Sequence, residues 1–108
     1  MANTVSEGKT AAIVSYLTII GTIIAYFMNS ESKNKFASFH IRQALGIHIT
    51  FYLIGALMGL FDGDFIIAAF YIFFMILWGY GILTAVSGEA KEIPLLGHYF
   101  QKWFSTIT

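Results

Sequence analysis

Residues 65–87 read FIIAAFYIFFMILWGYGILTAVS, an apolar stretch that carries no charged side chain. Isoleucine, phenylalanine and tyrosine favour β-strands, but the stretch is much longer than an ordinary strand. In lipid every backbone polar group must be satisfied within the protein, and a helix achieves this by itself. The stretch therefore predicts a helix that spans a membrane.

Two further apolar stretches precede this one. Residues 39–61 are separated from it only by the turn DGD, in which Gly63 relieves the backbone and the aspartates suit a turn. These two stretches should therefore form an antiparallel helical hairpin. Residues 11–28, AAIVSYLTIIGTIIAYFM, hold no charge and would reach roughly 27 Å as one helix, close to the hydrocarbon thickness of a bilayer. The sequence thus predicts three spans, at residues 11–28, 39–61 and 65–87.

The composition also points to lipid as the solvent. Of the 108 residues, 57% are hydrophobic and 11% are charged, whereas soluble domains have about 45–50% and about 25%. We expect a single membrane domain over residues 1–108. The net charge is zero without a basic block, which argues against nucleic acid as a partner. The first residues, MANTVSEGKT, lack the order of a cleavable signal, so the first apolar stretch is expected to remain as an anchor.

The end of the sequence predicts a different kind of helix. A linker with the only proline, Pro94, leads into residues 96–107. Helical spacing puts their apolar side chains on one side, namely Leu96, Tyr99, Phe100, Trp103, Phe104 and Ile107. The segment is too short to span, so we expect an amphipathic helix in the headgroup region. The predicted fold is all-α: an integral membrane bundle of three transmembrane helices plus this C-terminal amphipathic interfacial helix.

Lysine and arginine predict the orientation of the chain. Residues 29–38, the head of the second span and the C-terminal tail hold most of them, whereas the N-terminus carries only Lys9. With three spans, these two sets lie on opposite sides. The rule therefore places residues 29–38 and the C-terminal tail in the cytoplasm, and the N-terminus outside.

Small residues mark positions where membrane helices approach closely. The predicted packing positions are Ala11, Ser15, Thr18, Thr22 and Ala25 in the first span and Ala44, Gly55 and Gly59 in the second. Gly55 and Gly59 form a GxxxG motif, which is weak alone and stronger beside other small residues. Helix packing is one interpretation of these positions; a polar path along Ser15, Thr18 and Thr22 is the other.

Four polar side chains lie at the head of the second span, where residues 36–48 read FASFHIRQALGIH. Two of them, His40 and His48, are separated by about 12 Å along a helix, so they cannot bind one ion unless the helix breaks. We expect no metal, no cofactor and no catalytic residue here. Arg42 suits a positively charged anchor at the membrane boundary.

The remaining side chains of this cluster have several interpretations. His40 and Gln43 lie on one face near the membrane boundary, where they could bond a neighbouring helix end or the incoming tail. His48 lies about two turns deeper, where an ionisable group is costly. It is either a neutral histidine bonded to serine or threonine of the first span, or a group that senses or relays protons.

The motif FASFHIRQALGIH, the three-span layout and the closing GEAKEIPLLGHYFQKWF resemble a family of small bacterial membrane proteins. This family includes the magnetosome membrane proteins MamF and MmsF. The chain is also similar to the small subunit of the chloroplast inner-envelope import translocon. The likeness covers about residues 11–104. It implies a non-enzymatic protein of the bacterial cytoplasmic membrane, with a role in organelle or mineral formation for the first family and in channel or import function for the second.

Two functional hypotheses follow. The first is a structural or interaction subunit that assembles with itself or with a larger membrane-protein partner in the lipid bilayer. The second is an oligomeric channel or transport component, with a polar path near Ser15, Thr18, Thr22 and His48. An enzyme is not expected, because the sequence shows no nucleophile–base pair, phosphate-binding loop or set of metal ligands.

Overall fold

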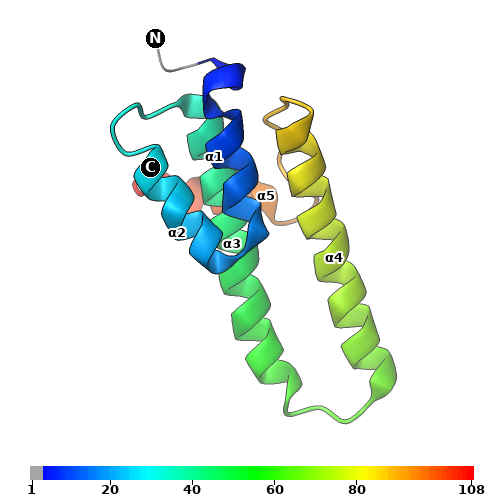
Figure 1. Ribbon diagram of the computed structural model, residues 1–108. Coiled ribbons are helices and arrows are strands. Elements are labelled where there is room, and N and C mark those ends of the chain that lie inside the picture. Colours follow the sequence, from blue (N-terminus) through cyan, green and yellow to red (C-terminus); the bar gives the residue numbers. More distant parts are fainter. Residues whose placement is uncertain (1–3) are drawn as a thin grey trace.

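The computed structural model describes residues 4–108, and within this range every regular element is a helix. The five helices are α1 (Val5–Leu17), α2 (Ile19–Met28), α3 (Lys35–Met58), α4 (Asp64–Val86) and α5 (Gly97–Trp103). The molecule is elongated, with principal extents of 51 × 23 × 21 Å. Its long axis follows α3 and α4, which stand side by side as an antiparallel pair (Figure 1).

The α3–α4 hairpin was predicted from the two long apolar stretches. Asn34 caps the start of α3 because its side chain accepts a hydrogen bond from the Ala37 amide. The turn before α4 depends on Gly63, whose φ of 153° is open to glycine and strained for other residues. Both helices are long and apolar enough to cross a membrane. The observed helices begin and end within a few residues of the predicted spans.

Residues 11–28 do not form one helix. Thr18 has extended backbone angles (φ −154°, ψ 175°), which end α1 at Leu17, and its side chain then accepts from the Gly21 amide to cap α2. The two short helices run in opposite directions and pack against each other (Figure 1). The structure therefore corrects the prediction of a single span over residues 11–28, because that stretch is a bent helical hairpin.

The bend is stable because its free backbone groups find partners. The Ser15 carbonyl accepts from the Thr22 hydroxyl at 2.6 Å, and the Tyr16 carbonyl accepts from the Trp78 indole Nε1 at 2.6 Å. Gly21 allows the two arms to close, since a methyl group there would overlap the Val14 carbonyl oxygen. In lipid, irregular backbone is costly unless partners such as these satisfy its polar groups.

The bend changes the expected topology. The Asn34 side-chain amide donates to the Thr4 carbonyl at 2.8 Å, so the start of α1 lies beside the loop that follows α2. The predicted placement of the N-terminus and residues 29–38 on opposite sides of a membrane does not fit this fold. Residues 1–3, which belong to that prediction, lie outside the described range.

The hydrophobic core lies in the half of the molecule where α1, α3, α4 and α5 meet. Tyr16, Leu77 and Phe100 are almost completely buried there. The other half consists of the α3–α4 hairpin alone, joined by stacked phenylalanines such as Phe51 and Phe70, whose ring centroids are 5.4 Å apart. The stripe of α4 that faces away from α3 is apolar and exposed along its whole length.

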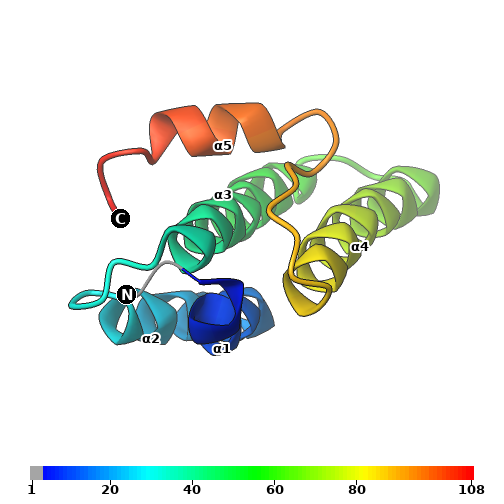
Figure 2. The same cartoon turned by 90° about the horizontal axis from the view of Figure 1, so that it is seen from above.

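The C-terminal helix is shorter than predicted and packs differently. α5 lies along α3 (Figure 2), where Phe100 fills the space above Gly46. The predicted apolar side is divided, because Phe100 is 2% exposed whereas Tyr99 and Trp103 are 48% and 63% exposed. Part of that side therefore docks on the bundle instead of entering lipid.

Candidate functional site

A buried hydrogen-bond network joins three elements at the core. The side chains of Tyr16, His40 and Gln43 are fully buried. Tyr16 comes from α1, and the other two lie on adjacent turns of α3. Their one-turn spacing on α3 places both side chains toward the Tyr16 hydroxyl.

The geometry decides which atom donates in each bond. His40 Nε2 lies 2.8 Å from the Glu89 carbonyl oxygen, which can only accept, so Nε2 carries the proton. His40 Nδ1 then accepts from the Tyr16 hydroxyl at 2.6 Å. The same hydroxyl oxygen accepts from Gln43 Nε2 at 2.9 Å. Every polar atom of this histidine is thus engaged as a neutral imidazole.

Gln43 extends the network to the linker between α4 and α5. Its Oε1 accepts from the Ile93 amide at 2.8 Å, and its Nε2 also lies 3.3 Å from the Lys91 carbonyl. A segment without regular structure leaves backbone groups unpaired, and these side chains satisfy them. The network therefore holds the linker against α3.

His48 lies about two turns further along α3 and joins a second polar cluster. The Thr22 hydroxyl donates to the Ser15 carbonyl, so its oxygen accepts from His48 Nδ1 at 2.9 Å. The Ser15 hydroxyl donates to the Ala12 carbonyl at 2.6 Å. These contacts tie the bent hairpin to α3. His48 also lines an open groove with Thr18, Trp78 and several aromatic side chains.

The small residues singled out in the sequence fall into two groups. Ala11, Ser15, Thr22, Ala25 and Ala44 are buried where α1, α2 and α3 meet. Thr18 lies at the bend and is exposed. Gly55 is partly exposed beside Phe70, and Gly59 lies past the end of α3.

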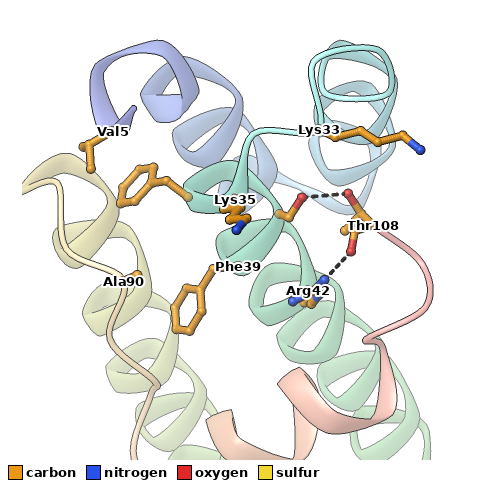
Figure 3. A pocket seen from close by; sticks show the side chains of 9 residues that line it. Val5, Lys33, Lys35, Phe39, Arg42, Ala90 and Thr108 are labelled. Atoms are coloured by element: carbon orange, nitrogen blue, oxygen red, sulfur yellow. Dashed lines mark hydrogen bonds between the residues drawn. The ribbon is translucent and has the colours of Figure 1, made fainter. Parts of the chain in front are cut away.

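Arg42 is partly exposed and lies apart from the His40–Gln43 network. Its guanidinium donates to the Thr108 carbonyl, and to that of Ser105 at 3.4 Å. Arg42 also lines a second groove, separate from the one beside His48, together with Lys35 and Ser38 (Figure 3). The four polar residues of the motif FASFHIRQALGIH, namely His40, Arg42, Gln43 and His48, thus lie in three separate environments.

Two sets of buried polar contacts were not predicted from the sequence. Tyr16 was not among the residues singled out there, yet it is the centre of the His40–Gln43 network. Asn29 holds the loop before α3 by donating to Ser38 Oγ at 2.9 Å and accepting from the Asn34 amide at 2.9 Å. The signal available in the sequence was the run of asparagine and serine in that loop, which are residues that satisfy free backbone groups.

The polar atoms of this arrangement are used in hydrogen bonds between elements. No group of three histidine, aspartate or glutamate side chains within residues 4–108 is placed to hold a metal ion. His40 uses both ring nitrogens for structural bonds. The chemistry of the site is therefore that of a polar cluster that fixes helices and a linker in place.

The described residues form an all-helical fold in which two helices are long and apolar enough to cross a membrane. The family model for MamF/MmsF, described as the magnetosome magnetite crystal formation protein family, matches residues 6–100. The chain belongs to this family, which confirms the resemblance to MamF and MmsF. No curated protein and no solved structure matches the chain.

Proposed function

We propose that this protein is a non-enzymatic structural subunit of a membrane assembly. The observation that carries the proposal is its apolar outer surface. Large hydrophobic side chains stay exposed around the molecule, including Leu17, Ile20, Phe27, Leu53, Leu57, Phe65, Ile72, Met75 and Leu83. Monomeric soluble proteins rarely expose apolar surface of this extent, whereas a bilayer or another membrane helix would cover it.

The proposed arrangement places α3 and α4 across the bilayer and the α1–α2 hairpin within one leaflet. The hairpin begins and ends at the same side, so it enters the bilayer without crossing it. Its outward residues Ile20, Ile23 and Phe27 are exposed and apolar, as contact with lipid requires. Next to the bend, the Trp78 indole of α4 donates to the Tyr16 carbonyl, which removes the cost of leaving that carbonyl free in lipid.

Charge supports the orientation of this arrangement. All six lysine and arginine residues lie in the helices and loops of the end where α3 begins and α4 finishes. The charged residues at the α3–α4 turn are the two aspartates Asp62 and Asp64, and no lysine or arginine lies there. The positive-inside rule then places the cation-bearing end in the cytoplasm of a bacterial cell and this turn on the other side. The N-terminal part of α1 also belongs to the cytoplasmic side.

The polar side chains support a structural role over a catalytic one. Those that the sequence suggested as a site are used in bonds between elements: His40 and Gln43 hold the linker, and His48 holds the hairpin. A catalytic acid, base or nucleophile instead needs access to a substrate. We infer that these residues give the small bundle one defined shape to present to its neighbours.

The family description suggests which process such an assembly would serve. Members are associated with magnetite crystal formation in magnetosomes. We propose that this chain contributes to such a membrane as a packing or organising component, either as a homo-oligomer or beside a larger protein. The exposed aromatic and aliphatic side chains of α4, such as Phe65, Tyr71 and Ile72, provide the contact surface.

Crosslinking in native membranes tests this proposal. The chain has no cysteine, so Ile72→Cys on the exposed face of α4 provides a single reactive position. We expect a discrete crosslinked product with a second copy or a larger protein, and no such product from Ser87→Cys at the polar end. A protein that washes out of membranes with alkaline carbonate would contradict the proposal.

A channel or transport component is the second function considered. It is favoured by the groove beside Thr18 and His48, which brings two polar groups to an apolar surface. Against it, Ser15, Thr22 and His48 are buried and bonded to one another instead of lining an open path. Proton or ion flux into protein-containing vesicles above that of empty vesicles, and its loss in His48→Ala, would favour this alternative.

A further inference from the structure

A groove at the cation-bearing end has no assigned role. It has a volume of about 590 Å³ and lies between the first turns of α3 and the linker after α4 (Figure 3). Its walls combine apolar and basic side chains, and its lining residues are Val5, Lys33, Lys35, Phe36, Ser38, Phe39, Arg42, Ala90 and Thr108. No aspartate or glutamate is among them. Its chemistry therefore favours an anion that carries apolar groups.

Two cations of α3 form the polar side of the groove. Lys35 and Arg42 are seven positions apart in the helix, so they lie on the same face about two turns from each other. Figure 3 shows Lys35, Phe39 and Arg42 on the first turns of α3. The Lys33 side chain extends away from them. An anion bound between these two side chains would be attracted by both charges.

Arg42 supplies a second, independent observation. Its Nη2 donates to the Thr108 carbonyl, but its Nε is buried without an acceptor. Within residues 4–108 this is the single buried side-chain nitrogen or oxygen that lacks a hydrogen-bond partner. A buried unpaired donor is costly, and a charged one more so. Arg42 is therefore a cation beside the groove whose hydrogen-bonding capacity is not filled by the described residues.

The position of the groove selects the source of the anion. It lies where α3 begins, at the boundary between the charged end and the apolar surface of the molecule. Phe36, Phe39 and Val5 offer apolar walls that suit a glycerol backbone and the start of an acyl chain. Basic pockets at the cytoplasmic ends of membrane helices are suited to lipid headgroups.

We propose that this groove binds the headgroup of an anionic phospholipid, with its phosphate oxygens between Lys35 and Arg42. The inference rests on the proposed insertion of α3 and α4 in a bilayer. It goes further by assigning a lipid class and a site to the cytoplasmic boundary. The bound lipid would also tie α3 to the tail, because Arg42 contacts both the groove and Thr108.

Native mass spectrometry of the detergent-purified protein tests the site. Phosphatidylglycerol and phosphatidylcholine are added in parallel, and the retained lipid is counted. We expect selective retention of phosphatidylglycerol, weakened about fivefold in Lys35→Gln, because one interfacial cation contributes about that factor. Lys102→Gln on α5 is the matched control, since it removes an exposed cation outside the groove and should leave retention unchanged.

Further arms distinguish the source of the anion and the role of Arg42. Arg42→Lys keeps the charge but removes Nε, so it should also weaken retention. Equal retention of both lipids, equal losses in Lys35→Gln and Lys102→Gln, or displacement of phosphatidylglycerol by millimolar inorganic phosphate would each overturn the proposal. Carbonate extraction of the same variants reports membrane insertion separately, so a failed lipid site is distinguishable from a failed membrane assignment.

Discussion

At the scale of single residues, two histidines of one helix are held in different ways. His40 bonds a tyrosine hydroxyl and a linker carbonyl, whereas His48 bonds a threonine whose own hydroxyl is already donated. Both arrangements satisfy polar atoms that would be costly to leave unpaired in an apolar setting. The value of these side chains to the fold thus lies in the backbone and hydroxyl groups that they pair.

Gln43→Leu should destabilise the protein by about 1–3 kcal/mol, because it leaves a buried backbone amide without an acceptor and removes one of the two hydrogen bonds at a buried hydroxyl. The affected groups are the Ile93 amide and the Tyr16 hydroxyl. The measurement is the free energy of unfolding in mixed detergent micelles. Gln101→Leu is the control, since it removes a single bond to the Phe39 carbonyl at a partly exposed position. Equal losses in the two variants would argue against the network.

Thr22→Val should loosen the bent hairpin at nearly constant side-chain volume. The variant removes the hydroxyl that donates to the Ser15 carbonyl and accepts from His48. We expect a loss of about 1 kcal/mol in the free energy of unfolding, as is typical for hydrogen bonds between membrane helices. Thr50→Val, a partly exposed threonine of α3, should change stability little. A stable Thr22→Val protein would mean that the bend depends on packing alone.

At the scale of elements, the molecule consists of one long hairpin and two smaller units docked against its polar half. The α1–α2 hairpin is held by polar contacts at its bend and at its open end, where Asn34 reaches Thr4. α5 depends on a different device, because Phe100 packs directly onto the backbone at Gly46. The two docking modes therefore respond to different substitutions.

Gly46→Ala should displace α5 from α3. A methyl group at this position would overlap the Phe100 ring, and overpacking of this kind costs about 1–3 kcal/mol. We expect faster trypsin cleavage after Lys102, measured by mass spectrometry of the digested protein. Gly79→Ala provides the control, because a methyl group there would meet nothing within 4 Å. Unchanged cleavage in Gly46→Ala would show that α5 does not depend on this contact.

At the scale of the whole molecule, all lysine and arginine residues lie at one end only because the first apolar stretch bends back on itself. Three straight spans would leave Lys9 on the opposite side from the other cations. The observed fold brings it to the same end, so every lysine and arginine lies away from the α3–α4 turn. Under the positive-inside rule, all six cations then favour the same orientation, whereas the three-span topology leaves Lys9 on the opposite side.

Site-directed labelling tests this topology directly. Because the chain has no cysteine, Ser6→Cys, Ser32→Cys and Asp62→Cys each introduce one exposed thiol. In intact cells, a membrane-impermeant maleimide should label only Asp62→Cys, and permeabilisation should be needed for the other two. Labelling of Ser6→Cys from outside, with Ser32→Cys protected, would instead support three spans and sink the proposed insertion.

The amount that could be predicted differs between elements for physical reasons. The DGD turn and the uncharged stretch at residues 65–87 identify a helical hairpin, because length and polarity alone decide such elements. Threonine at position 18 suits the start of a helix, yet it lies in a stretch whose overall hydropathy indicates one span. Hydropathy measures how favourably a segment transfers into lipid. It does not report whether one helix continues through that segment.

The sequence by itself indicated a lipid environment and determined the helical class, the family and the α3–α4 hairpin. Each of these depends on local composition, spacing or motifs. Only the tertiary structure decided that the first apolar stretch turns back and that Tyr16 joins His40 and Gln43. It also decided that Phe100 docks on Gly46. The physical reason is that a polar atom in an apolar setting needs a partner, and which group supplies that partner is settled by contacts between residues distant in the chain.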